Sequence, residues 1–542
     1  MKRLSIISSL LLLASGCAQI VNPTGGPKDV TPPKALEYHP GNKSTRSHPQ
    51  KIDITFDEYI QLKELSKQFI ISPPLKFLPI PLVKGRVLEI SLKKDTLLEN
   101  TTYTFNFGNA VCDLNEANPI KNFQYVFSTG SYVDSLSIHG VALDAFSHAP
   151  IQEGLVLLYS NMGDSVPYKK NPAYCGQTDD NGYYHIDNIK NGNYRLIALT
   201  KGAGDYLYHP YTQSIAFYSD TFSLIKNDTV NFFLFTEEQP KLQFSKAKAV
   251  GKGQILLTFN KAADSISITP VNLKDTVKYN TLLQYSATHD SITYWIDYPN
   301  IDSLRFIISH NKKPMDTAIV YNIPGHTIVS SKKNKKPEKP PVLQVSLNTA
   351  DKAAFDYHLP FTIQFPHPVT KINLSKIFLT HRKDTLPLKQ TDQSSFFLSL
   401  RPTKDLISDS TYRITILPGA FTDFFNYTND TVIHKFTIQE QNYFGTLTLA
   451  LAFTKKTHYL VQLMDDKSNI VRQDTVSGTT SIFYDGLPPA VYGIRVIEDN
   501  NNNGKWDIGN FLKQVQPEKV YYYSDKINIR SNWDLTQSWK VN

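Results

Sequence analysis

The stretch that decides the fold is Lys94-Asp95-Thr96-Leu97-Leu98-Glu99-Asn100-Thr101-Thr102-Tyr103-Thr104-Phe105. It returns downstream as Lys404-Asp405-Leu406-Ile407-Ser408-Asp409-Ser410-Thr411-Tyr412-Arg413-Ile414. Asp113 and Asp423 then follow the two copies at nearly equal spacing. Apolar and polar residues alternate after a polar turn in both copies, which predicts half-buried β-strands. The repeat therefore indicates two copies of one β-rich module.

Further alternating stretches flank each copy. The matching pairs are residues 52–56 with 361–365, and residues 124–128 with 435–438. A third copy begins at residues 255–259 and has residues 302–308 in place of the Thr-Tyr strand. Short strands separated by Asp, Asn, Gly and Pro predict antiparallel β-sandwiches. The first copy resembles the bacterial Ig-like domain of the SbsA type, and we infer the other two from their likeness to it.

A second class of repeat alternates with the first. Residues 178–186 lead into a strand that starts at Tyr194, and residues 480–484 lead into a strand that starts near Tyr492. Asn191-Gly192 supplies a two-residue turn centre before the first of these strands. Both copies resemble the transthyretin-like or carboxypeptidase-regulatory-like β-sandwich. That resemblance implies non-catalytic spacers or binding units.

The repeats predict an all-β chain of five tandem antiparallel sandwich modules with little helix. The expected divisions are 1–16 (signal peptide), 17–30 (flexible tether), 31–131 (Ig-like), 132–235 (transthyretin-like), 236–329 (Ig-like), 330–341 (Lys/Pro linker), 342–439 (Ig-like) and 440–542 (transthyretin-like). The linker carries the dense basic run 332–336 and several prolines. We expect a solvated hinge there rather than a nucleic-acid patch.

The N-terminus predicts a lipid anchor. Met1-Lys2-Arg3 precedes the apolar residues 4–13 and the small residues Ala14-Ser15-Gly16, and Cys17 follows directly. This order resembles a bacterial lipoprotein signal, in which the peptide is cut before an acylated cysteine. The alternative is an ordinary signal peptide with an incidental cysteine. The apolar stretch is too short to span a bilayer, so the expected state is anchored to a membrane.

The residues after Cys17 carry a further resemblance. The run Pro23-Thr24-Gly25-Gly26-Pro27-Lys28-Asp29 resembles the start of a family of Bacteroidota lipoproteins with Ig-like domains. The resemblance implies attachment to the outer membrane. Acidic residues often follow the cysteine in lipoproteins exported to the surface of such cells. Residues 18–22 have none, so the side of the outer membrane stays open.

Composition restricts the possible functions. The chain has 542 residues, 41% of them hydrophobic and 12% aromatic, which suits several sandwich cores. The net charge of +8 is dispersed, so no nucleic-acid partner is expected. Cys112 and Cys175 are the two cysteines beyond the signal, and they fall in different modules. A disulfide framework is thereby excluded, while pairing of these two residues stays open.

One loop has the spacing of a calcium site. Asp499, Asn501 and Asn503 offer side-chain oxygens at alternate positions, Lys505 a backbone carbonyl and Asp507 a further carboxylate. Gly504 is sixth, but Asn510 stands where an EF-hand has its bidentate Glu. The set predicts weak Ca²⁺ binding, on the order of 10⁻⁴–10⁻³ M. The alternative is a polar turn without metal. In the other copy Lys201 replaces Asp499, so no site is expected there.

The remaining polar motifs give little sign of catalysis. We find no motif for a zinc hydrolase, a serine nucleophile or a phosphate-binding loop. Asp57 and Glu58 are neighbours on a strand and would face opposite ways. Asp113 and Asp423 are expected to bond local backbone amides. Three of the four tryptophans, at positions 506, 533 and 539, are expected to close the last sandwich rather than anchor a partner.

These observations favour a non-catalytic, lipid-anchored scaffold of the outer membrane with a protein partner in the envelope. Two other functions stay open. One is an accessory subunit of an outer-membrane machine for protein assembly or secretion. The other is a surface lipoprotein that binds polysaccharide.

Overall fold

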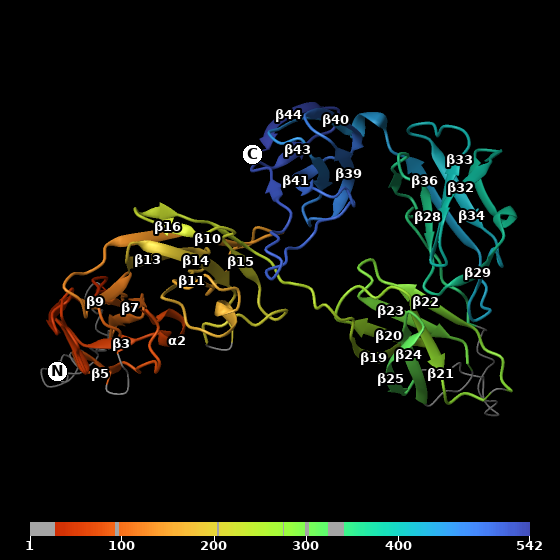
Figure 1. The fold of residues 1–542 in the computed structure, drawn as a ribbon. Coiled ribbons are helices and arrows are strands. Elements are labelled where there is room, and N and C mark those ends of the chain that lie inside the picture. Colours follow the sequence, from red (N-terminus) through yellow and green to blue (C-terminus); the bar gives the residue numbers. More distant parts are fainter. Residues whose placement is uncertain are drawn as a thin grey trace, which may run out of the picture. The chain divides into compact units, whose positions relative to one another are not determined.

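The computed structural model describes residues 28–92, 97–202, 205–274, 276–298, 303–323 and 341–541. It divides into two compact units, Met1–Glu237 with Gly509–Gln516, and Glu238–Ile508 with Pro517–Asn542. Cys17, the signal peptide, most of the tether and residues 330–340 of the expected hinge lie outside the described residues. Strands dominate each unit (Figure 1), which confirms the predicted fold class. Within the described ranges, α2 (Leu65–Gln68) is the one α-helix, beside 3₁₀ turns at Val166–Tyr168, Leu374–Lys376 and Gln441–Tyr443.

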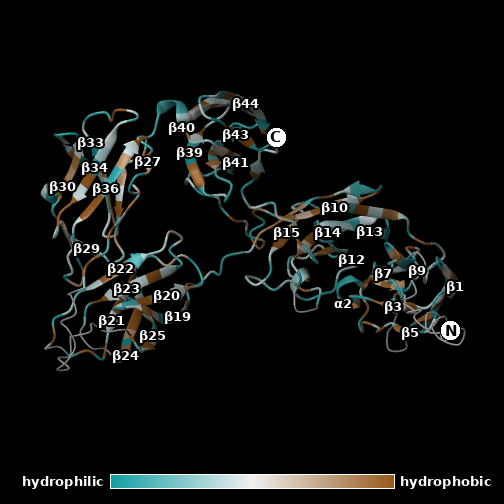
Figure 2. Ribbon diagram, turned by 180° about the vertical axis from the view of Figure 1, so that it is seen from behind, coloured by the Kyte–Doolittle hydropathy of each residue, from teal (hydrophilic) through white to brown (hydrophobic). Residues whose placement is uncertain are grey.

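The first module of unit 1 encloses its own core between two sheets. One sheet has the order β1 (Ala35–His39), β2 (Lys51–Phe56), β6 (Val87–Ser91), β5 (Leu82–Lys84). The other has β4 (Ile70–Ser72), β7 (Thr102–Gly108) and β9 (Phe123–Ser128), with the small pair β3 (Ile60–Leu62) and β8 (Val111–Asp113). Alternate residues of β2 are buried, as the sequence period requires. Figure 2 shows hydrophobic and hydrophilic residues interspersed along such strands.

The second module follows in the same unit. Its first sheet contains β13 (Tyr183–Ile189), β10 (Leu136–Asp144), β17 (Asp228–Thr229) and β18 (Phe232–Leu234). Its second sheet contains β12 (Tyr174–Gln177), β11 (Leu155–Tyr159), β14 (Gly192–Leu199), β15 (Ile215–Phe217) and β16 (Phe222–Leu224). Strands β17 and β18 pair with β10 in parallel. Parallel pairs were not predicted, because they join the first and last strands of a module and leave no local sequence signal.

Unit 2 begins with the third and fourth modules. The third has the sheets β19 (Phe244–Gly251), β20 (Gln254–Phe259), β23 (Ser291–Ile296), β22 (Thr281–Tyr285) and β21 (Ile266–Pro270), β24 (Ser303–His310), β25 (Lys313–Tyr321). The fourth has the sheet β26 (Ser346–Leu347), β28 (Phe361–Gln364), β33 (Phe397–Pro402), β32 (Leu388–Gln393). Its other strands are β27 (Ala354–Phe355), β36 (Val432–Ile438), β34 (Thr411–Ile416), β30 (Ile377–His381), β31 (Asp384–Leu386), and the pair β29 (Val369–Ile372), β35 (Phe421–Asp423). Each module has its own hydrophobic core.

The fifth module closes on a parallel pair as the second does. Its sheets are β40 (Thr480–Leu487), β37 (Gly445–Phe453), β44 (Asp534–Val541) and β39 (Ile470–Val476), β38 (His458–Met464), β41 (Ala490–Asp499), β42 (Val520–Tyr522), β43 (Ile527–Ile529). Strand β44 runs parallel to β37 over its whole length. The first and last strands are therefore neighbours in both members of the second repeat class.

The tyrosines of the repeats make matching hydrogen bonds. In the first and fourth modules, the hydroxyl groups of Tyr103 and Tyr412 each accept the backbone N–H five residues earlier, at 2.8 and 2.9 Å. In the second and fifth modules, the hydroxyl groups of Tyr194 and Tyr492 each donate to the backbone carbonyl four residues earlier, at 2.7 and 2.9 Å. At these tyrosines the two repeat classes thus differ in their hydrogen bonds: the hydroxyl accepts a backbone N–H in one class and donates to a backbone carbonyl in the other.

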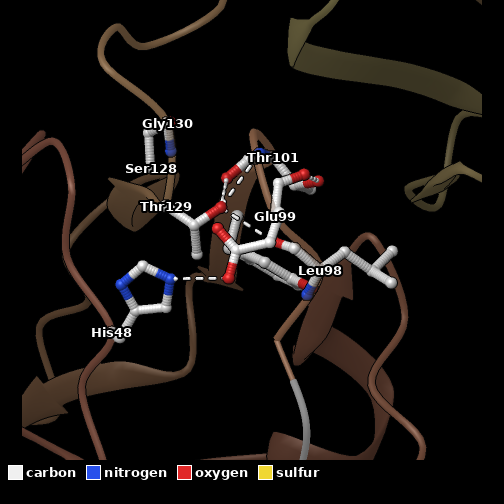
Figure 3. Close-up of polar contacts among 8 residues, drawn as sticks. His48, Leu98, Glu99, Thr101, Ser128, Thr129 and Gly130 are labelled. Atoms are coloured by element: carbon white, nitrogen blue, oxygen red, sulfur yellow. Dashed lines mark hydrogen bonds and ion pairs between the residues drawn. The ribbon is translucent and has the colours of Figure 1, made fainter.

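A threonine clamp ends the first module (Figure 3). The Thr129 hydroxyl donates to the Leu98 carbonyl at 2.7 Å and accepts the Thr101 N–H at 3.0 Å. The Thr129 N–H donates to the Thr101 carbonyl at 3.0 Å. Beside the clamp, His48 and Glu99 meet at 3.2 Å. The clamp fixes the chain where it leaves the first module for the second.

Candidate functional site

The predicted calcium loop starts at a buried carboxylate. Strand β41 ends at Asp499, which is fully buried. Its two oxygens accept the backbone N–H groups of Asn503 and Gly504, each at 2.9 Å. Gly504 has a φ of +78°, a conformation that glycine adopts at no steric cost. Asp499 thereby fixes the sharp turn that the sequence predicts.

Two of the other predicted ligands converge on Asp507. The side-chain amides of Asn501 and Asn503 both donate to Asp507 Oδ2, the second at 2.7 Å. Lys505 donates its backbone N–H to Asn503 Oδ1 at 3.0 Å. Rotating an amide by 180° exchanges its nitrogen for its oxygen. A cation beside Asp507 could thus gain two amide oxygens, and the donor set fits Ca²⁺ in its chemistry.

Glu518 is a third carboxylate that the sequence analysis missed. Its oxygens accept the backbone N–H groups of Asn500 at 2.7 Å and Asp507 at 3.0 Å. Burial raises the pKa of this carboxyl, and the charges of Asp507 and Asp499 raise it further. Its distance from Asp499 along the chain left no motif to find. Within the described ranges, no three His, Cys, Asp or Glu side chains are grouped to hold a metal ion.

Two of the three tryptophans of the C-terminal tail pack within the fifth module, as predicted. Trp506 donates its indole N–H to the Glu518 carbonyl at 2.7 Å. Trp539 packs at the core, with its ring 5.4 Å from that of Tyr523. Trp533 is instead half-exposed, and the Arg530 guanidinium lies 4.7 Å from its ring centre.

The polar residues singled out elsewhere have local roles. Asp113 accepts three backbone N–H groups at 2.6–2.9 Å, and Asp423 accepts two at 2.7 and 2.9 Å. Both assignments from sequence are confirmed. Lys201, the counterpart of Asp499, forms an ion pair with Glu153. The position that begins the loop with an acidic side chain in the fifth module therefore carries a basic side chain in the second.

A joint between the first two modules is the other candidate site. Cys112 and Cys175 are both free and buried, so they do not pair. The Cys175 backbone N–H donates to the Ser72 hydroxyl at 3.1 Å, and its thiol donates to the Ile71 carbonyl at 3.3 Å. Burial raises the pKa of the Cys175 thiol to about 12. This cysteine is therefore a structural residue of the joint.

Three further hydrogen bonds cross the same joint. The Asn188 amide donates to the Thr104 hydroxyl at 2.9 Å. The Thr102 hydroxyl donates to Asp134 at 2.8 Å and accepts the Asp134 N–H at 3.0 Å. Most of these groups are buried, and buried hydrogen bonds hold the orientation of packed elements. The joint therefore fixes the second module on the first.

Comparison with known proteins supports the assignment of the first module. Residues 29–129 match the model of the bacterial Ig-like domain. The comparison with curated proteins gave no match.

Several solved structures show remote similarity. The major pilin subunit BcpA of Bacillus cereus has 10% identity over 75% of this chain and 99% of its own, with a TM-score of 0.14. The S-layer protein rSbsC has 12% identity over 92% and 67%, with a TM-score of 0.15. The Bacillus anthracis TIE protein has 10% identity over 100% and 79%, with a TM-score of 0.13. Scores this low carry no argument about the function of this chain.

Proposed function

We propose that the chain is a non-catalytic scaffold of the cell envelope, anchored to the outer membrane by acylated Cys17 and bound to a protein partner. The joint of unit 1 is the observation that carries this proposal. A scaffold must hold its modules in fixed orientation, and the Ser72–Cys175, Thr104–Asn188 and Thr102–Asp134 contacts do so with hydrogen bonds. The polar groups of the joint are hydrogen-bonded across it to the neighbouring module, which suits a spacer better than an enzyme.

The N-terminal sequence supports the anchor. A basic start, residues 4–13 and the small residues before Cys17 suit acylation of that cysteine. Within the described part of the chain, no helix is long and apolar enough to cross a membrane. Stable attachment by lipid needs two chains or one chain with a second contact. An acylated Cys17 that carries more than one chain meets this need.

Metabolic labelling with an alkyne fatty acid tests the anchor. We expect label on the wild type and on the matched control Cys112→Ser, and none on Cys17→Ser. The Cys17→Ser variant should also leave the membrane fraction. Label that persists in Cys17→Ser would refute acylation at Cys17, and an unlabelled wild type would refute lipidation and leave an ordinary signal peptide.

Crosslinking in intact cells tests the partner. A specific envelope protein captured by the tagged full-length chain supports the scaffold. A β-barrel protein in that position identifies an accessory subunit of an outer-membrane machine. Recovery of the uncrosslinked chain alone contradicts both. Proteinase treatment of intact cells then reports which side of the outer membrane the modules face.

One cavity in unit 2 favours polysaccharide binding as a second function. It has a volume of about 460 Å³ and is lined by Trp295, Phe396 and the amide side chains of Gln254, Gln284 and Gln364. Amides can bond sugar hydroxyls, and aromatic rings can pack on sugar faces. Retention on a glycan array that is lost in Gln284→Ala/Gln364→Ala, but kept in the exposed control Gln393→Ala, would establish this function. Absence of retention by the wild type excludes it.

We also propose that residues 499–507 bind Ca²⁺ weakly and stabilise the fifth module. Of the five predicted ligands, Asp507, Asn501, Asn503 and the Lys505 carbonyl would hold the ion. Both oxygens of Asp499, the fifth, bond to backbone N–H groups, so this residue would fix the turn. The convergence of both amides on Asp507 supports this proposal. The ion would act as a structural ligand and would not take part in catalysis.

A further inference from the structure

The segment Gly509–Gln516 belongs to unit 1 although it is remote in sequence from the rest of that unit. Phe511 is 1% exposed, and its hydrogen-bond partner Glu237 lies 274 residues earlier. The adjacent Leu512 is 67% exposed. The segment therefore inserts one selected side chain rather than a general apolar face.

The pocket that receives Phe511 is aromatic. The Phe511 ring lies 5.3 Å from Phe217, 5.7 Å from Tyr208 and 6.0 Å from Tyr168, measured between ring centres. The contacts with Phe217 and Tyr208 are edge-to-face, an arrangement that aromatic quadrupoles favour. The Arg195 guanidinium lies 5.2 Å from the Phe511 ring centre and adds a cation–π contact.

A buried carboxylate accepts a hydrogen bond from the backbone of the segment. Glu237 is 6% exposed and accepts the Phe511 N–H at Oε1, at 2.8 Å. Its Oε2 accepts the Tyr208 hydroxyl at 2.7 Å. Burial raises the pKa of Tyr208, and the bond to Glu237 raises it further, so this hydroxyl stays a donor. A buried carboxylate requires such donors, and Phe511 supplies one of the two.

Neighbouring groups fix both ends of the segment. A Cβ atom on Gly509 would lie 2.5 Å from the Phe235 ring, so this position requires glycine. Gln516 donates its amide to the Phe217 carbonyl at 2.8 Å and to the Ser219 hydroxyl at 3.0 Å. On the pocket side, Arg195 donates to Asp164 at 2.8 Å and to the Met162 carbonyl at 3.0 Å. The guanidinium is thus held in place over the ring.

We propose that the second module carries a peptide-docking site and that its ligand is the chain's own segment Gly509–Gln516. The site selects an aromatic side chain whose backbone N–H is free to meet Glu237. In the bound state the segment fills the aromatic pocket of the second module with Phe511, and we call the segment the latch. Released, it would leave an aromatic pocket with a buried carboxylate short of one donor, so the bound state is favoured.

Hydrogen exchange on the full-length chain tests the latch. In the wild type we expect protection of the Phe511 amide, and we expect Phe511→Ala and Glu237→Ala to lower that protection by about tenfold or more, as local opening does. The matched controls Leu512→Ala and Glu238→Gln, both at exposed neighbours, should leave it unchanged. Glu237→Gln should keep most of it, because its amide oxygen can still accept the Phe511 N–H. An unprotected segment in the wild type overturns the proposal.

A photo-crosslinker at position 512 tests the occupant without emptying the pocket. Benzoylphenylalanine at this exposed position should form a crosslink to residues of the second module within one chain. A product of twice the mass would mean that the segment of a second copy fills the pocket, and would overturn docking in cis. Crosslinks to neither would overturn the site itself. This result does not depend on whether Phe511→Ala folds.

Discussion

The hydroxyl of Ser72 in the first module accepts a hydrogen bond of 3.1 Å from the backbone N–H of Cys175 in the second. Cys175 lies on β12, the edge strand of its sheet. An edge strand has backbone groups without partners in the sheet, and proteins must cover or pair them. The first module supplies that cover here, so the contact joins two modules and protects an edge at once.

Replacing Ser72 by Ala should weaken this joint. The Cys175 N–H would stay buried without an acceptor, which costs about 1–3 kcal/mol. Urea denaturation of the full-length chain should show an earlier transition for Ser72→Ala. The exposed control Ser91→Ala should unfold as the wild type does. Equal midpoints for Ser72→Ala and wild type would show that the hydroxyl does not hold the joint.

Thiol labelling should report opening of the same joint. Burial raises the pKa of Cys175 to about 12 and also raises that of Cys112, so both should react slowly in the folded chain. In Ser72→Ala we expect labelling of Cys175 to quicken by about tenfold, in line with a cost of about 1.4 kcal/mol. Cys112 should keep its rate and serves as the internal control. Equal acceleration at both cysteines would indicate general unfolding instead.

The joint should also respond to pH through His185 and Asp187. The two side chains meet at 2.7 Å, and this hydrogen bond raises the pKa of His185 above 6.5. Burial works against ionisation of Asp187, but the hydrogen bond and charge of His185, together with Gln124 and Lys43 of the first module, outweigh it and lower the pKa of Asp187 below 3.8. The histidine contribution is fully present below pH 6.5 and is lost as the pH rises through its raised pKa.

Because the His185 side chain is partly exposed, solvent screening limits this pH effect to about 0.5 kcal/mol. The free energy of unfolding of the wild type should fall between pH 5.5 and pH 8.5. This fall should be larger than that of His185→Ala by about 0.5 kcal/mol. Asp187→Asn should remove the same difference, and the double variant should add nothing. Additive effects of the two substitutions would show that the pair does not titrate as a unit.

Calcium should raise the melting temperature of the full-length chain if residues 499–507 bind it. At a Ca²⁺ concentration several times the dissociation constant, the gain in the free energy of unfolding is on the order of 1 kcal/mol. Asp507→Asn should abolish the gain while keeping a side chain of equal size at the centre of the loop. The control Asp180→Asn, in the corresponding module, should still respond. Melting curves that coincide in millimolar Ca²⁺ and in chelator would leave a polar turn.

The sequence predicts those features that depend on neighbours along the chain. The strands, the repeated Tyr103 and Tyr412 and the turn roles of Asp113 and Asp423 follow from local patterns, because alternation and Asx turns involve few residues. Asp499 fixes its turn through N–H groups only four and five residues away. All-β architecture and these local roles were therefore within reach of the sequence.

Features made by distant residues left no such pattern. Glu518 reaches its loop from the irregular chain just before β42, and the parallel pairing of β37 with β44 joins strands at opposite ends of a module. Glu237 and Phe511 each look ordinary in sequence, since one acid and one aromatic residue have no diagnostic spacing. The partners of these residues are decided by packing, which a single sequence does not display.

The span between Glu237 and Phe511 has a consequence for biogenesis. The pocket forms from residues made early, while its occupant is made 274 residues later. Closing so long a loop is slow relative to folding of each module. Occupation of the pocket thus reports that synthesis has passed the fifth module's longest loop. A prematurely terminated product would keep an exposed aromatic cleft, the kind of surface by which cellular proteolysis sorts incomplete chains from finished ones.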